Sequence, residues 1–95
     1  MALNLRHQNG AEFALRFWAR VQRARREGNA VEYHRLIAWL LQRIAASDIT
    51  DAQARAAFNS AHSRNLTGPE WTTLKSSRLQ PMATRYAAVL SEGDL

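Results

Sequence analysis

The chain has 95 residues, no cysteine, and 13 basic residues against 8 acidic ones, giving a formal net charge of +5. This length fits one domain, and we expect residues 1–95 to form it, with flexible ends at 1–8 and 92–95. Without cysteine the chain has no disulfide and no thiolate chemistry. That composition suits the reducing cytoplasm, where we expect the protein to act.

Neither a secretory signal nor a membrane span is expected. The first ten residues lack an apolar run, and the densest apolar run, residues 36–41, is too short to cross a bilayer. All basic residues except Lys75 are arginine, a bias that high-GC genomes produce, so we expect a bacterial or phage source. Residues 1–43 hold eight arginines and three glutamates, whereas residues 44–95 are balanced.

Four helix starts are predicted from capping signatures. In each, a residue whose side-chain oxygen caps free backbone N–H groups is followed three positions later by Glu or Gln. The four signatures are Asn9 with Glu12, Asn29 with Glu32, Thr50 with Gln53, and Thr67 with Glu70. The acidic members also favour the positive end of the helix dipole.

The first two predicted helices cover residues 10–27 and 30–46. Only Gly28 and Asn29 separate them, so they are expected to form an antiparallel hairpin. Phe13, Phe17 and Val21 form an apolar stripe on the first helix. The second helix carries a wider apolar arc and is the expected centre of the core.

Three shorter helices are predicted to follow, at residues 51–62, 68–77 and 81–91. Pro69 suits the first turn of its helix, and Pro81 is taken as the start of the last one. No segment alternates in the manner of a strand. The predicted fold class is therefore all-α, a compact single-domain array of about five helices.

An arginine row on the first helix is the first candidate binding site. Arg16, Arg20 and Arg23 share one face, and Arg26 flanks them. Guanidinium groups bind phosphates and carboxylates in a bidentate manner. The alternative interpretation is a solvated helix face on which Arg23 pairs with Glu27.

Trp39 is the second candidate, because Arg35 and Arg43 lie four residues before and after it. Its indole is a candidate anchor for a protein interface or a platform for a nucleic-acid base. The alternative is that a neighbouring helix covers it, since large aromatic residues are mostly buried. Trp18, beside Arg25, is a weaker candidate of the same kind.

A helix-turn-helix formed by residues 51–62 and 68–77 is the third candidate. Its alternative DNA contacts would be Thr72, Thr73, Lys75 and Arg78. The connection is longer than usual and lacks a clear glycine, and the second helix carries little net positive charge. This hypothesis is therefore the weakest of the three.

The sequence favours no catalytic chemistry. The histidines at positions 7, 34 and 62 show no metal-ligand spacing, and no glycine-rich phosphate loop occurs. We expect no enzymatic activity, no metal and no cofactor. The leading expectation is a protein-interaction or regulatory module that engages an acidic partner, or its own twin in a homodimer, through the first two helices. The alternative is a nucleic-acid binder that uses the same arginines.

Overall fold

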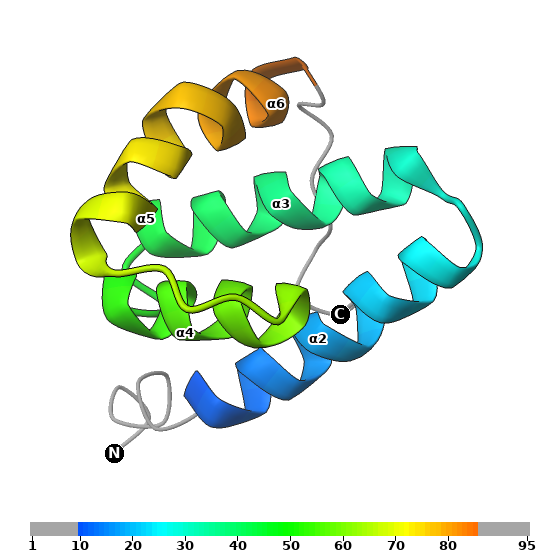
Figure 1. Cartoon of the computed structure of the whole chain (residues 1–95), viewed down its shortest axis with the longest axis horizontal. Coiled ribbons are helices and arrows are strands. Elements are labelled where there is room, and N and C mark those ends of the chain that lie inside the picture. Colours follow the sequence, from blue (N-terminus) through cyan, green and yellow to red (C-terminus); the bar gives the residue numbers. More distant parts are fainter. Residues whose placement is uncertain (1–9, 86–95) are drawn as a thin grey trace.

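The computed structural model describes residues 10–85, and all regular structure in this range is helical (Figure 1). The elements are α2 (Gly10–Arg26), α3 (Ala30–Ala45), α4 (Asp51–His62), α5 (Gly68–Leu74), the π-helical segment η1 (Lys75–Leu79) and α6 (Gln80–Arg85). Because α5, η1 and α6 follow one another without a break, the described range contains four helical rods. The predicted all-α fold class is confirmed.

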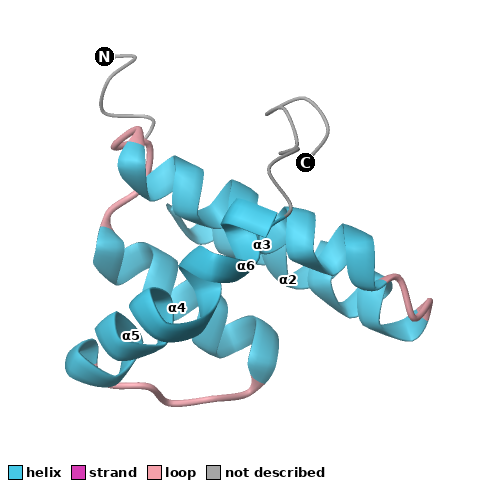
Figure 2. Ribbon diagram, turned by 90° about the horizontal axis from the view of Figure 1, so that it is seen from above, coloured by secondary structure: helices cyan, strands magenta, loops and turns pink. Residues whose placement is uncertain are grey.

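The α3 helix occupies the centre of the arrangement. Figure 1 shows it between α6 on one side and α2 and α4 on the other. The hairpin of α2 and α3 is present, but α2 packs more extensively against α4 than against α3. Seen from above, α6 lies over α3 (Figure 2), and these two helices are in contact. The core therefore surrounds α3.

Local capping accounts for the helix starts. Thr50 and Thr67 form complete capping boxes with Gln53 and Glu70, and Asn29 accepts a hydrogen bond from the backbone N–H of Glu32. These three predicted starts are confirmed. The predicted cap at position 9 lies outside the described residues.

The same backbone motif ends each of the first three described helices. At the end of α2, Gly28 adopts a φ of 65°, and the N–H of Asn29 reaches back to the carbonyl of Ala24 at 2.8 Å. This Schellman geometry normally takes glycine at the left-handed position. After α3 and α4, however, that position holds Ser47 (φ 61°) and Ser63 (φ 53°).

The prediction of a break between residues 77 and 81 is wrong, because α5, η1 and α6 form one continuous helix. The chain instead widens into the π-helical segment, where the N–H of Gln80 donates to the carbonyl of Lys75, five residues earlier. Pro81 follows directly. Proline has no N–H, and its ring collides with the carbonyl four residues earlier in a regular α-helix. We attribute the widened turn to this conflict. Residues 86–91 of the predicted last helix lie outside the described range.

A buried tryptophan fastens α5 to the start of α4. Trp71 is fully buried, and its Nε1 donates to a carboxylate oxygen of Asp51 at 3.1 Å. Lys75 donates to the same oxygen at 2.5 Å. Burial raises the pKa of Asp51, but the hydrogen bonds from Lys75 and Trp71 outweigh it and leave the pKa below its usual value.

Within residues 10–85, no helix combines the length and apolar character that a membrane crossing requires.

Candidate binding surface

Trp39 belongs to the core. Only 3% of it is exposed, and its ring stacks on that of Phe13, with centroids 4.6 Å apart and planes 10° from parallel. Its Nε1 has no hydrogen-bond partner among the described residues. The structure thus shows the alternative interpretation, in which a neighbouring helix covers Trp39, and the covering helix is α2. Trp39 does not reach a partner from this position.

Three arginines of α2 that were predicted to form a binding site have acidic partners within the chain. The pairs are Arg16–Glu12 at 2.7 Å, Arg20–Glu32 at 2.6 Å and Arg23–Glu27 at 3.2 Å. On α3, Arg35 lies 3.9 Å from Glu32, and Arg43 pairs with Asp48. The exposed pairs Arg16–Glu12 and Arg23–Glu27 stabilise the fold only slightly, but all five pairs together neutralise much of the charge on the predicted site.

The surplus charge is located elsewhere. Residues 10–85 hold eleven arginines and one lysine against six acids. The arginines that make no ion pair with a described residue are Arg25, Arg26, Arg55, Arg64, Arg78 and Arg85. Four of these six follow residue 43. The arginines without an acidic partner therefore lie mostly in the second half of the sequence, although the first half has the larger net charge.

A hydrogen-bonded pair joins the start of α3 to the end of α4. The Tyr33 hydroxyl lies 2.6 Å from Nε2 of His62, and Nδ1 of His62 lies 2.8 Å from the carbonyl oxygen of Phe58. Because a carbonyl only accepts, Nδ1 carries the hydrogen of the neutral ring. Nε2 therefore accepts from the Tyr33 hydroxyl.

Arg25 and Arg64 flank this pair. Tyr33 and His62 themselves stay uncharged at neutral pH. Burial lowers the pKa of His62 more than its hydrogen bond to Phe58 raises it, and Arg25 and Arg64 lower it further. Burial also raises the pKa of Tyr33, more than the two arginines lower it. We call Arg25, Tyr33, His62 and Arg64 the arginine corner. Its tyrosine and histidine supply no negative charge to balance the arginines.

An apolar flank adjoins the corner on α2. Leu15 is 69% exposed and Trp18 is 45% exposed. Arg25 follows Trp18 by seven residues, about two helical turns, and so shares its side of α2. Between them, Nε2 of Gln22 donates to the carbonyl of Ala61 at 2.6 Å, which fixes this side of α2 to the end of α4. Arg26 lies on the same side as Leu15.

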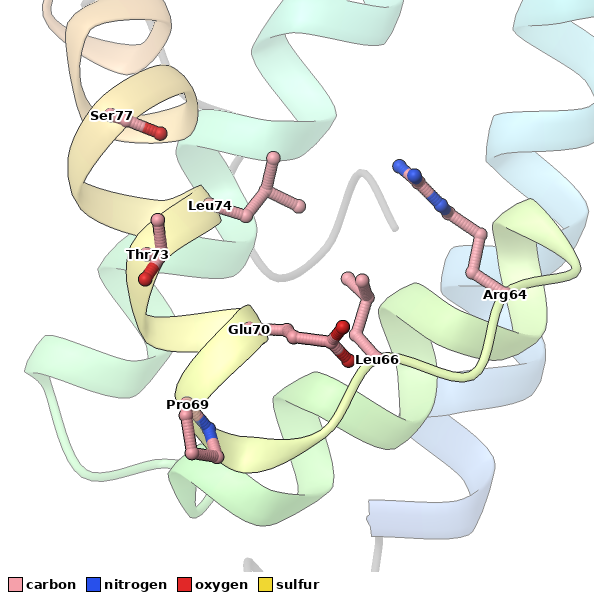
Figure 3. Close-up of a pocket in the computed structure, with 7 residues that line it drawn as sticks. All are labelled: Arg64, Leu66, Pro69, Glu70, Thr73, Leu74 and Ser77. Atoms are coloured by element: carbon pink, nitrogen blue, oxygen red, sulfur yellow. The ribbon is translucent and has the colours of Figure 1, made fainter.

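A shallow groove adjoins the corner on its other side (Figure 3). Its volume is about 410 Å³, and it is lined by Arg64, Leu66, Pro69, Glu70, Thr73, Leu74 and Ser77. Leu66 and Leu74 point into it from the loop and from α5. Asn59 holds the loop through hydrogen bonds to both backbone groups of Leu66, at 3.1 and 3.2 Å.

The acid in this groove is engaged locally. The Glu70 carboxylate accepts from the backbone N–H of Thr67 at 2.9 Å, and this hydrogen bond is the main reason that its pKa is lowered. Arg64 lowers that pKa further through its charge, although the two side chains form no ion pair. Glu70 therefore serves mainly as a helix cap.

The alternative DNA contacts differ in their surroundings. Thr72, Thr73 and Arg78 are exposed, whereas Lys75 is held by Asp51 and lies 5.5 Å from the centroid of the Trp71 ring. Five residues, 63–67, connect α4 to α5. Three of the four proposed contacts are thus accessible.

Comparisons of the chain with models of protein families, with curated proteins and with solved structures found no match. The inference of function therefore depends on the geometry above. Sequence reasoning missed Arg64 and the Tyr33–His62 pair, because these residues meet only when α3 and α4 pack. Trp18 and Arg25 were noted in the sequence, where Trp18 was the weaker of the two tryptophan candidates for a binding site.

Proposed function

We propose that the protein is a small non-catalytic binding module that engages an acidic segment of a partner protein. The observation that carries this proposal is the convergence of Arg25 and Arg64 on an uncharged tyrosine–histidine pair. Neither arginine has an acidic partner among the described residues. A carboxylate of the partner would supply the missing charge through bidentate hydrogen bonds.

The apolar flanks favour a protein over a nucleic acid as the partner. Leu15 and Trp18 are exposed on α2, the helix that carries Arg25, and Leu66 and Leu74 line the groove that includes Arg64. Tryptophan and arginine are enriched in protein interfaces, whereas phosphate contacts need charge and polar groups. The expected partner segment is acidic and also presents apolar side chains.

Charge also favours a foreign partner over a second copy of this chain. A symmetric contact between two arginine corners would bring like charges together, which disfavours association. Five of the six described acids already form ion pairs within the chain. We therefore prefer an acidic partner to a homodimer. The proposed location is the cytoplasm, on the composition of the chain alone.

A nucleic acid is the second candidate partner, because Thr72, Thr73 and Arg78 are exposed along one helix. A duplex bound there would meet α5 and η1 rather than the arginine corner. Thr72 and Arg78 belong neither to the arginine corner nor to the groove beside it, so the two candidates can be separated by substitution.

The test measures the affinity of the full chain for a labelled synthetic peptide of alternating glutamate and leucine, and for a labelled DNA duplex. Replacing both Arg25 and Arg64 by Gln should weaken peptide binding at least about tenfold. Arg55→Gln, which removes one positive charge from α4, should leave binding nearly unchanged, and Arg25→Gln alone is the comparison of equal charge.

A second matched pair addresses the apolar flank. Trp18→Ala should weaken peptide binding, whereas Val31→Ala should not, although Val31 is also exposed, at 56%. The proposal is overturned if the peptide does not bind, or if Arg55→Gln weakens binding as much as the double variant. Tighter, steeply salt-dependent binding of the duplex would favour the nucleic-acid candidate instead.

A further inference from the structure

A second cavity lies between α3 and the helical segments η1 and α6, and its lining is basic and apolar. Its volume is about 430 Å³, and it is lined by His34 from α3 and by Arg78, Pro81, Met82 and Arg85. This volume lies in the range of small-molecule sites, roughly 300–1,000 Å³. Among the described residues, no acid lines it.

Two arginines line it. Arg78 and Arg85 are both exposed, and neither forms an ion pair with a described residue. They are seven residues apart, which corresponds to about 10 Å along a helix. Both line the same cavity, so their guanidinium groups are placed to bind two separate acidic groups of one molecule.

Two apolar residues and a histidine complete the lining. Pro81 and Met82 lie between the two arginines in the sequence, and His34 reaches the cavity from α3. An imidazole nitrogen can donate to an oxyanion, while Met82 suits an irregular apolar body because thioethers adapt their shape. This combination of two basic residues with apolar ones suits a short molecule that carries two acidic groups.

The backbone beside the cavity is the irregular one. Arg78 lies within the π-helical segment, and Pro81 follows it. Such π-helical turns occur often at functional sites, because they redirect side chains.

We propose that the cavity between α3 and α6 binds a small molecule or ion that carries two acidic groups, one at Arg78 and the other at Arg85. The acidic groups are carboxylates or phosphates, since both match the guanidinium group. This site uses no residue of the arginine corner and is independent of the proposed protein partner.

The test is a calorimetric and NMR titration of the full chain at constant ionic strength. Glutarate and pyrophosphate serve as the carboxylate and phosphate probes, and butyrate is the single-charge control. Saturable binding of glutarate or pyrophosphate, with backbone shifts at His34, Arg78 and Met82, is the expected result. Arg78→Gln and Arg85→Gln should each weaken binding at least about tenfold.

Matched variants separate this site from the other one. Arg55→Gln should leave dianion binding unchanged, and so should the double replacement of Arg25 and Arg64. The proposal is overturned if neither dianion saturates, if butyrate binds as tightly as glutarate, or if Arg55→Gln is as damaging as Arg78→Gln. It is also overturned if a DNA duplex, and neither small dianion, depends on Arg78 and Arg85. None of these results bears on peptide binding at the arginine corner.

Discussion

The hydroxyl of Tyr33 donates to Nε2 of His62 across 2.6 Å, joining the start of α3 to the end of α4. The ring of His62 also stacks on Phe58, with centroids 4.0 Å apart. These contacts hold the histidine between two arginines in its neutral form. The arginine corner is thus built around groups that neither repel nor neutralise an incoming carboxylate.

The pH dependence of stability tests the state of His62. Its pKa in the folded protein lies below the usual 6.5, so the unfolded chain binds this proton more readily. The stabilising contribution is complete above about pH 6.5 and is lost as the pH falls through the folded pKa. We expect the free energy of unfolding, measured in urea, to fall less steeply below about pH 6.5 in His62→Gln than in the wild type.

His34→Gln is the matched control for this experiment, because it removes a histidine that lies outside the hydrogen-bonded pair of Tyr33 and His62. It should retain the steep decline of the wild type. Parallel pH profiles for His62→Gln and the wild type would contradict the assignment of His62 as a neutral, buried acceptor.

The two tryptophans of the hairpin should respond differently to truncation. Trp39→Ala removes a buried ring stacked on Phe13 and should cost about 3–5 kcal/mol of stability. Trp18→Ala removes a ring that is 45% exposed and should cost far less. Chemical denaturation of both variants measures the difference. Equal losses would show that Trp18 is as much a part of the core as Trp39.

The left-handed helix ends provide a paired prediction. Gly28→Ala should destabilise the protein by about 1 kcal/mol, because φ is positive there and only glycine adopts this region without cost. No atom lies within 4 Å of the added Cβ, so the cost comes from the backbone alone. Ser63→Gly should stabilise by up to about 1 kcal/mol at the equivalent position. Thermal or urea unfolding that shows the same sign for both variants would refute this interpretation.

Helix starts were the most predictable part of the fold, because capping depends on residues three positions apart. Thr50 and Thr67 lie in the structure at the predicted positions with the predicted hydrogen bonds. The continuous last helix was not predictable in this way. Proline normally ends a helix, and the hydrogen bond from Gln80 to Lys75 that bypasses this rule requires a π-helical turn.

The binding surface was less predictable, because it depends on which charges meet in space. Local pairs such as Arg23 with Glu27 follow from spacing, but Arg20 with Glu32 bridges two helices. Trp39 was singled out because it lies four residues from both Arg35 and Arg43, yet the ring of Phe13 on α2 covers it. Tyr33 and His62 are 29 residues apart, and no sequence signal joins them.

The most direct test of the central claim is NMR mapping of the full chain with the glutamate–leucine peptide. The largest shifts should occur at the Trp18 indole and the Arg25 and Arg64 guanidinium groups, with smaller ones at Leu66 and Leu74. They should disappear when Arg25 and Arg64 are both replaced by Gln. Shifts confined to Arg78 and Arg85, or no saturable shift, would contradict the claim that the arginine corner is the binding surface.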